Sequence, residues 1–252
     1  MQGAALLDEL MANAWRPLTE ELRGDWRFRW TDGVTRRANS VLAIGAAEPL
    51  EDLVAHAEDF YGRRGAPTLV QVTTASAPRG LSAFLRSNGY RATAATLVEE
   101  AATAVVVERT ESRFDVAIST SPSDEWFDTY WSVESSRGLS ESDMALCREV
   151  LLAPELPMVF TTAFDGSEAL GVGQLVIKRG WAGVQCMATR PSGRRKGLAR
   201  AVLNGLATEA AQRGIGRMYL AVMATNDAAA ALYSSAGFTT SHEYCYFKNQ
   251  PT

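Results

Sequence analysis

The spacing of hydrophobic residues along the first part of the chain alternates between helical and strand periods. Apolar side chains at Leu6, Leu7, Leu10, Met11 and Trp15 share one face of a helix predicted over 4–22. Beyond it, the pattern predicts strands at 26–30, 35–44, 68–74 and 93–98 and helices at 49–62 and 79–87. The pair Asp32-Gly33 predicts a tight turn between the first two strands.

The second part of the chain begins after the charged stretch 108–112 and has a more regular pattern. It predicts strands at 114–119, 158–164, 170–178, 182–189, 218–224 and 244–247 and helices at 123–133, 140–153, 197–213 and 227–235. Ser123 stands where a helix N-cap is expected, and so does Ser140, with Asp143 three residues on. This order indicates an α/β protein with hairpins and crossover helices.

A weak internal repeat connects the two parts. The first contains Arg64-Gly65, a strand, a short helix and Asn88-Gly89-Tyr90, and the second contains Arg213-Gly214, a strand, a short helix and Ala236-Gly237-Phe238. The reference glycines are 24 residues apart in the first part and 23 in the second. This shared order favours a duplicated fold. We therefore expect two domains, residues 1–110 and 111–252.

The segment 190–200 joins a predicted strand to a predicted helix and is strongly basic. Its cations are Arg190, Arg194, Arg195, Lys196 and Arg200. A helix N-terminus already carries about half a positive charge, so each cation there is disfavoured by ~0.3–1 kcal/mol. Unpaired N–H groups, a glycine and flanking cations together suit a pyrophosphate group. The alternative is a solvated basic turn.

Two motifs in the second half resemble those of one superfamily. Arg194-x-x-Gly197-x-Ala199 after an apolar strand resembles the signature Arg/Gln-x-x-Gly-x-Gly/Ala of the GCN5-related N-acetyltransferase (GNAT) superfamily. Asn226-x-x-Ala229-x-x-Leu232-Tyr233-x-x-x-Gly237-Phe238 resembles its second motif and lies at the expected distance downstream. Arg195 departs from the pattern, because glycine is common there. The resemblance implies two GNAT-like α/β (α+β) domains, each with a mixed, largely antiparallel central sheet flanked by helices.

The resemblance also implies a cofactor, acetyl-coenzyme A (acetyl-CoA), and roles for individual residues. The positions it assigns to cofactor binding are Met187, Ala188, Thr189, Arg194, Arg195, Lys196, Gly197, Leu198, Ala199, Arg200, Asn226, Ala229 and Tyr233. The strand edge 187–189 would hydrogen-bond the pantetheine arm, and an N–H near Met187 would stabilise an oxyanion. Tyr233 would protonate the departing thiolate as general acid, and Glu134 is our choice of general base.

Each of these roles has a structural alternative. Tyr233 could be a packing tyrosine, and Asn226 could simply cap the helix that follows it. Glu134 could be a solvated charge on a helix face. Cys186 suggests a covalent intermediate, but no histidine is placed to activate it, so a buried small residue is favoured.

The first half resembles the N-terminal part of bacterial two-domain GNAT proteins whose first domain is degenerate. Residues 43–48 precede the helix at 49–62 without a basic, glycine-permissive loop, and Glu48 would repel a pyrophosphate. We therefore predict no second coenzyme site. Arg36, Arg37 and Asn39 could line an acceptor pocket or could be outward-facing strand residues; both interpretations remain open.

Composition narrows the class of partner. The net charge is −4 and the sequence pI is near 5.4, which argues against nucleic acid as the main partner. Three widely spaced cysteines suit a reducing compartment, and two histidines without nearby ligands make a metal site improbable. With no signal peptide or membrane-spanning run, we expect a cytoplasmic enzyme without a membrane partner.

The leading hypothesis is acetyl transfer from acetyl-CoA to a primary amine, by direct attack in a ternary complex. A small metabolite is the expected acceptor, because the acidic overall charge gives no sign of a nucleic-acid surface. Two alternatives remain: acetylation of a protein, peptide or aminoacyl-tRNA amine, and a non-catalytic module that binds coenzyme A. The pattern does not predict the oligomeric state.

Overall fold

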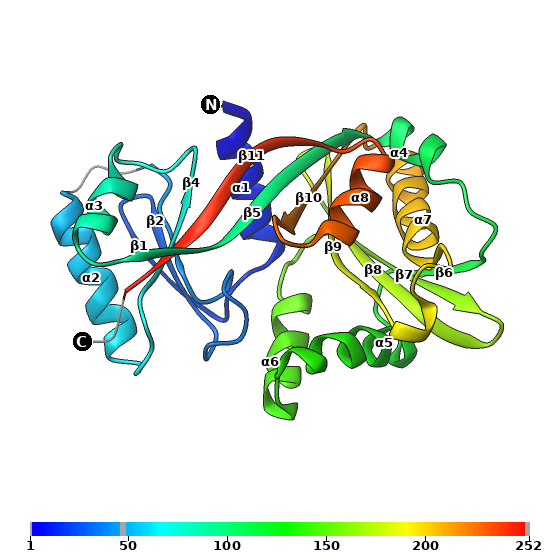
Figure 1. Cartoon of the computed structure of the whole chain (residues 1–252), viewed down its shortest axis with the longest axis horizontal. Helices are drawn as coiled ribbons and strands as arrows, with labels where there is room; N and C mark the ends of the chain where they lie inside the picture. The colour runs from blue at the N-terminus through cyan, green and yellow to red at the C-terminus, as the bar shows by residue number, and fades with distance from the viewer. Residues whose placement is uncertain (1, 46–48, 250–252) are drawn as a thin grey trace.

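The computed structural model describes residues 2–45 and 49–249 (Figure 1). The helices are α1 (Gln2–Ala14), α2 (Leu50–Gly62), α3 (Leu81–Ser87), α4 (Thr103–Arg109), α5 (Asp124–Glu134), α6 (Glu141–Leu152), α7 (Leu198–Gln212) and α8 (Asp227–Ser235). The strands are β1 (Thr19–Arg23), β2 (Trp26–Trp30), β3 (Val41–Leu42), β4 (Leu69–Thr73), β5 (Arg91–Ala102), β6 (Val116–Ser119), β7 (Met158–Asp165), β8 (Glu168–Lys178), β9 (Trp181–Thr189), β10 (Arg217–Met223) and β11 (Thr239–Lys248). Short 3-10 turns cover Ser135–Arg137 and Pro191–Gly193.

All of these strands join one 11-stranded sheet, in the order β1-β2-β3-β4-β11-β5-β10-β9-β8-β7-β6. The pairs β3–β4 and β9–β10 are parallel, and the other neighbours are antiparallel. The predicted class, a mixed and largely antiparallel α/β fold flanked by helices, is confirmed. The structure adds that the two halves share one continuous sheet. The domain boundary at residue 110 stays a prediction.

The two halves exchange strands at the middle of this sheet (Figure 1). Strand β11 follows β10 and α8 in sequence, but it lies between β4 and β5. In the same way, β5 follows β4 and α3 but lies between β11 and β10. By the internal repeat, β4 is equivalent to β10 and β5 is equivalent to β11. The series β4-β11-β5-β10 therefore has the same arrangement of equivalent strands in both directions. Each half lacks one central strand of its own and receives it from the other half.

Buried side chains divide between the faces of the sheet. On one face, α7 and α8 bury Leu206 and Tyr233 against the β10 residues Met218 and Leu220. On the other face, α1 buries its Leu7, Leu10 and Met11 against Tyr219 of β10 and Tyr244 of β11. Helix α1 therefore covers the exchange region and contacts strands from both halves, which joins them through a shared core.

Helix α1 is also anchored by a buried polar group. Asp8 is 1% exposed, and its carboxylate lies 3.0 Å from Nε2 of His242 on β11. The same carboxylate accepts a hydrogen bond of 2.6 Å from the hydroxyl of Thr73 on β4. One side chain thus connects α1 to a strand of each half.

Three predictions for the first half are wrong. The helix predicted over 4–22 ends at Ala14, because Pro17 restricts the residue before it, and 19–23 instead forms β1. Strand β2 was predicted to form a hairpin with 35–44, but its hairpin partner is β1. Gly24, in the turn between β1 and β2, has a φ of +56°. The strand predicted over 35–44 is reduced to β3, Val41–Leu42. Pattern analysis also missed α4, whose β-branched run Val105–Val107 is not typical of a helix.

Candidate active site

The loop between β9 and α7, residues 190–197, leaves a row of backbone N–H groups without partners. The first α7 hydrogen bond is donated by Ala201 to the carbonyl of Gly197. Within the described chain, the amides of residues 195–200 donate to no protein acceptor. No side chain caps α7, and its first turn holds no acidic residue. These donors and the helix dipole therefore point at a place for an anion.

Two residues of this loop have a left-handed backbone. Gly197 has a φ of +102°, which only glycine adopts without strain. Arg195 has a φ of +63°, at the position where the superfamily pattern often has glycine. The side chains of Arg194, Arg195 and Lys196 are exposed, and Lys196 forms an ion pair of 2.8 Å with Asp165. The guanidinium of Arg200 donates to the carbonyl of Arg109 on α4. Arg194 and Arg195 are thus exposed in the same loop as the unpaired amides, whereas Lys196 and Arg200 have protein partners.

Strands β9 and β10 separate just before this loop. Their parallel pairing covers Trp181–Val184 of β9 and Arg217–Leu220 of β10 and stops there. Residues 185–189 of β9 remain paired with β8 on the other side, whereas 221–223 of β10 pair with β5. We call the unpaired edges 185–189 and 221–223 the β9–β10 opening. Backbone donors and acceptors along this opening are available to an extended ligand.

A β-bulge shapes the β9 side of the opening. The register with β8 shifts between Val172 and Gln174, so Cys186 and Met187 face the single residue Gly173. Cys186 takes a φ of +54°. The N–H of Arg190 donates to Leu170 of β8, so strand alternation directs the N–H groups of Met187 and Thr189 into the opening. Ala188 is buried between them.

Tyr233 on α8 is 7% exposed, with its ring in edge contact with Phe238 at 5.9 Å between centroids. Burial raises the pKa of its phenol well above the ordinary value, and the nearby Glu99 carboxylate raises that pKa further. The phenol therefore keeps its proton at neutral pH. Asn226 caps α8, since its Oδ1 accepts a 3.2 Å hydrogen bond from the amide of Ala229. The capping interpretation of Asn226 is thus confirmed, and its contact with a cofactor stays a prediction.

Glu99 of β5 is a buried carboxylate that sequence analysis missed. It is 6% exposed and lies opposite Leu220 of β10, on the face where its neighbours Leu97 and Ala101 pack with the core that contains Tyr233. Its Oε2 atom is buried without a hydrogen-bond partner. Strand exchange brings this residue of the first half into the core of the second. The signal available in sequence was only the alternation Leu97, Glu99, Ala101.

We expect Glu99→Gln to raise stability at neutral pH by about 1–3 kcal/mol, because an unsatisfied buried carboxylate is replaced by a neutral amide. Burial raises the pKa of Glu99, so the native state holds the proton more tightly than the unfolded chain does. The destabilisation is therefore present above the folded pKa and disappears as pH falls through it. Urea unfolding between pH 4 and 8 should show that the difference in the free energy of unfolding between variant and parent decreases as the pH falls.

Glu100→Gln is the matched control for this prediction. Glu100 is the next residue along β5; its side chain is 31% exposed and lies 3.9 Å from the guanidinium of Arg217. Its substitution should change stability little at any pH, as for exposed ion pairs generally. A gap between Glu99→Gln and parent that stays constant with pH would contradict the assignment of the penalty to a buried charge.

Cys186 lies where the two halves meet, on the opposite face of β9 from Met187. It packs with Trp15, Ala38 and Val150, which come from the first half and from α6. Burial raises the pKa of its thiol to about 12, so the thiol is a poor nucleophile at neutral pH. The Glu134 carboxylate at the end of α5 acts on the same thiol and also raises its pKa. Helix α5, which ends at Glu134, packs against β9, the strand that contains the bulge. The role of Glu134 as the base stays a prediction.

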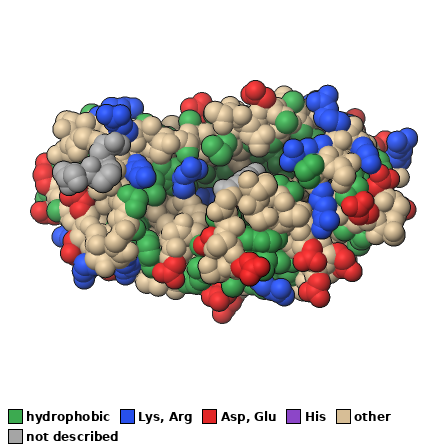
Figure 2. Space-filling view, turned by 60° about the horizontal axis from the view of Figure 1, so that its bottom comes forward, with side chains coloured by type: hydrophobic (Ala, Val, Ile, Leu, Met, Phe, Trp, Pro, Cys, Tyr) green, Lys and Arg blue, Asp and Glu red, His purple; other side chains and the backbone are tan. Residues whose placement is uncertain are grey.

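Arg36, Arg37 and Asn39, the polar residues of the first half that could line an acceptor pocket, have three different environments. Asn39 is buried, and its side chain holds the 31–35 loop through four hydrogen bonds to Thr31, Gly33, Val34 and Thr35. Arg36 is exposed and lines a small cavity beside Trp30 and Pro67. Arg37 instead lies over the ring of Trp15 at 4.8 Å, toward the second half. Figure 2 views the side of α5 and α6 and shows a recess between the halves with hydrophobic and basic side chains around it.

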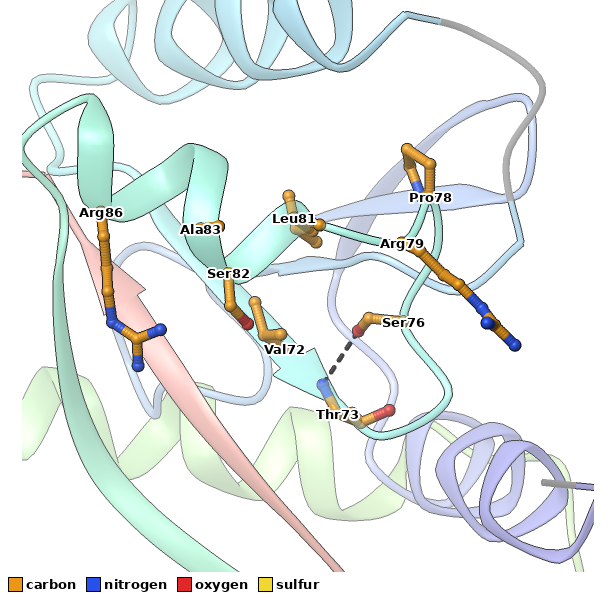
Figure 3. A pocket seen from close by; sticks show the side chains of 10 residues that line it. Val72, Thr73, Ser76, Pro78, Arg79, Leu81, Ser82, Ala83 and Arg86 are labelled. Carbon is orange, nitrogen blue, oxygen red and sulfur yellow. Dashed lines mark hydrogen bonds between the residues drawn. The ribbon is translucent and has the colours of Figure 1, made fainter.

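The part of the first half that corresponds to the β9–β10 opening is closed. Ile44 forms a β-bridge with Ser76, and the amide of Ala77 donates to the carbonyl of Ala43. The indole of Trp26 also donates to the carbonyl of Ala77 at 2.8 Å, which fixes this closure. Figure 3 shows the cavity beside it, where Thr73 and Ser76 are joined by a hydrogen bond and Arg79 and Arg86 lie at the edges. Glu48, expected to repel a pyrophosphate, lies outside the described residues.

Across residues 2–45 and 49–249, no helix is both long and apolar enough to cross a membrane. The same residues bring together no group of three or more histidine, cysteine, aspartate or glutamate side chains suited to hold a metal ion.

The chain is a GNAT-type N-acetyltransferase, an enzyme that transfers an acyl group to an amine. The chain belongs to the family described as "Probable histone acetyltransferase Rv0428c C-terminal", whose model matches residues 5–247. A relative from Bacillus subtilis, "Uncharacterized N-acetyltransferase YobR", is 28% identical over 248 residues, which are 98% of each chain. The superfamily resemblance inferred from the two motifs is thereby confirmed.

Solved structures show the same fold over most or nearly all of the chain. A GCN5-related N-acetyltransferase from Kribbella flavida has a TM-score of 0.73 at 15% identity and covers 99% of this chain and 96% of its own. A tandem GNAT protein from the clavulanic acid biosynthesis pathway has a TM-score of 0.63 at 13% identity, covering 80% of this chain and 70% of its own. A shorter likeness, 46% identity over 52 residues, links the chain to the Escherichia coli K12 [ribosomal protein bS18]-alanine N-acetyltransferase, covering 21% and 35% of the two chains.

Proposed function

We propose that the protein transfers acetyl from acetyl-CoA to a primary amine of a small molecule, with both reactants bound together. The observation that carries this proposal is the row of unpaired amides at 195–200, in a loop that contains Arg194, Arg195 and Lys196 and lies next to the β9–β10 opening. The pyrophosphate of acetyl-CoA requires hydrogen-bond donors of this kind, and the amide groups of its pantetheine arm require an unpaired strand edge. Both requirements meet at one end of β9.

In this proposal the β9–α7 loop holds the pyrophosphate of the coenzyme. The amides of residues 195–199 donate to it, and Arg194, Lys196 and Arg200 add positive charge. The backbone of Met187, Ala188 and Thr189 binds the pantetheine arm as an added strand, with Asn226 and Ala229 on the other side of the opening. Acetyl-CoA supplies the activated acyl group, and the residues of this chain position the amine against it.

Glu134 and Tyr233 act as general base and general acid in this proposal. Glu134 accepts a proton from the attacking amine, and Tyr233 donates its phenolic proton to the departing thiolate. The N–H of Met187 donates to the oxyanion that forms in between. The phenol of Tyr233 is protonated at neutral pH, as a general acid must be. Cys186 takes no covalent part, since its thiol stays protonated.

We further propose that the protein holds one coenzyme molecule and not two. The bridge between Ile44 and Ser76 and the Ala77–Ala43 hydrogen bond occupy the edge that an added strand would need in the first half. The first half then serves as a structural partner that completes the sheet and forms one wall of the acceptor site.

A protein acceptor is the second candidate. It is favoured by the likeness of 52 residues to an enzyme that acetylates an alanine of ribosomal protein bS18. The family description, which names a probable histone acetyltransferase, points the same way. The net charge of −4 gives no indication of a surface that binds acidic partners, so basic proteins remain the relevant class.

The deciding experiment is a panel of acceptors assayed for release of free thiol from acetyl-CoA by the full-length protein. The panel contains small amines, amino acids, and peptides with free N-termini or lysines. Amine-dependent thiol release, with the acetylated product identified by mass spectrometry, supports the proposal. Turnover of peptides alone would replace the small acceptor by a protein. Coenzyme binding without turnover of any member would favour a coenzyme-binding module.

A further inference from the structure

Arg37 presents an arginine head group to the interface of the two halves. Its guanidinium carbon lies 4.8 Å above the centre of the Trp15 ring, and its side chain is half-buried. Stacking engages only the flat face of the guanidinium, which leaves the N–H donors in its plane. No described residue accepts a hydrogen bond from these donors, and no described carboxylate pairs with them. Arg37 is therefore equipped to bind an anion that the chain itself does not supply.

The position of this head group is fixed by its surroundings. Trp15 is 2% exposed, and its indole N–H donates to the hydroxyl of Thr35 at 3.0 Å. The loop that carries Arg37 is held by the buried Asn39, whose amide satisfies four backbone groups. A residue on so constrained a loop loses little freedom on binding a ligand, which favours recognition.

Other arginines of the first half are satisfied in ways that Arg37 is not. Arg29 is buried, and its donors reach Ser40 and the side chain of Gln71 at 2.7–2.9 Å. Arg27 pairs with Glu20 at 2.9 Å. Arg64 also lies over an aromatic ring, but it donates in addition to the carbonyl of Phe60 at 2.6 Å. Arg86 also lies over an aromatic ring, that of Phe247 at 5.1 Å, and likewise donates to no described acceptor. What distinguishes Arg37 is its place where the two halves meet.

Arg37 lies in the region where the first half packs against the bulge of β9. Trp15, on which it stacks, packs together with Ala38 and with Cys186, the bulge residue next to Met187. The positive charge of Arg37 acts to lower the pKa of the Cys186 thiol, whereas the negative charge of Glu134 acts to raise it. The Cys186 thiol is therefore within electrostatic range of a cation from the first half and of an acid at the end of α5.

We propose that the acceptor is a small primary amine that also carries a carboxylate, and that Arg37 binds this carboxylate while the amine lies toward Glu134. A guanidinium binds a carboxylate through two parallel hydrogen bonds, which fixes orientation as well as position. The half-buried setting of Arg37 between the halves favours a small molecule over an acidic protein surface. This inference rests on the proposed acetyl transfer and names the class of acceptor for it.

The test uses amino acids with increasing separation between amine and carboxylate, from glycine to 6-aminohexanoate, each compared with its own amide. The full-length protein should prefer the acid over its amide about ten- to hundredfold in kcat/KM, at one separation above all. Arg37→Gln should remove this preference by lowering kcat/KM for the acid to the value for the amide. Thermal unfolding at the temperature of the parent protein shows that the variant is folded. Arg37→Glu should reverse the preference.

Arg36→Gln is the matched control, since Arg36 is the adjacent residue but lines a separate cavity beside Trp30. It should keep the preference of the parent protein. Equal turnover of acids and amides, or a preference that survives in Arg37→Gln, would overturn the assignment and leave acetyl transfer standing. Calorimetry with the same amino acids separates the two claims further. Binding that is lost in Arg37→Gln without any thiol release would support the carboxylate site and refute acetyl transfer.

Discussion

Reversing the charge of Arg194 and Lys196 together is expected to weaken acetyl-CoA binding about 10²- to 10⁴-fold. Hydrogen bonds to charged groups contribute about 1.5–3 kcal/mol each, and two of them would be replaced by repulsion. The unpaired amides at 195–200 would remain, but a carboxylate beside them would compete with the pyrophosphate for the same donors. Isothermal titration calorimetry of the variant Arg194→Glu/Lys196→Glu measures this loss directly.

The matched control is Arg63→Glu/Arg213→Glu, which reverses two exposed cations near the C-terminal ends of α2 and α7. Each is paired with a carboxylate four residues earlier, Asp59 at 2.8 Å and Glu209 at 3.1 Å. The control changes the net charge by the same amount but should keep the affinity of the parent protein within about threefold, as exposed pairs contribute little. Similar losses in both variants would mean that overall charge, and not the β9–α7 loop, attracts the coenzyme.

Tyr233→Phe is expected to lower kcat about 10²- to 10⁴-fold while coenzyme affinity stays unchanged. This is the range typical of a positioned general acid. The ring is buried against Phe238, so phenylalanine can occupy the same space and the fold should be preserved. Steady-state kinetics with the best acceptor of the panel, together with calorimetry, separates the chemical step from binding.

Tyr90→Phe provides the comparison, because it removes a hydroxyl from another buried tyrosine, far along the sheet in the first half. Tyr90 is 3% exposed, and its hydroxyl donates to Glu58 at 2.8 Å. Its loss should cost some stability and leave kcat alone. If Tyr233→Phe turns over at the parent rate, another group or water delivers the proton, and Tyr233 is the packing residue that its burial alone would suggest.

Sequence reasoning succeeded where local chemistry decides structure. Ser123 and Ser140 were predicted as helix caps, and both accept a hydrogen bond from the expected amide, Ser140 within a capping box that includes Asp143. The helix start after the basic loop, predicted at 197 and found at Leu198, likewise follows from residues close together in sequence. Such features depend on propensity and short-range hydrogen bonds, so a single sequence contains them.

Features that depend on contacts between segments far apart in the sequence could not be predicted. The strand pattern at 93–98 predicted β5 but not its partners, because alternation fixes which side chains share a face and not which strand lies alongside. Glu99 could not be recognised for the same reason, since its burial comes from β10 and β11. Arg37 was one of three candidates, and only the packing of α1 and the β9 bulge distinguishes it.

The exchange of β5 and β11 also has a consequence for how the protein is made. The central position between β4 and β5 must wait for residues 239–248, although β4 and β5 are complete by residue 102. During synthesis the first half therefore leaves the ribosome with a gap in its sheet and two strand edges that another chain could pair with. Folding of this protein is thus expected to finish late and in one cooperative step, and a nascent chain halted before β11 should be sensitive to proteases throughout its first half.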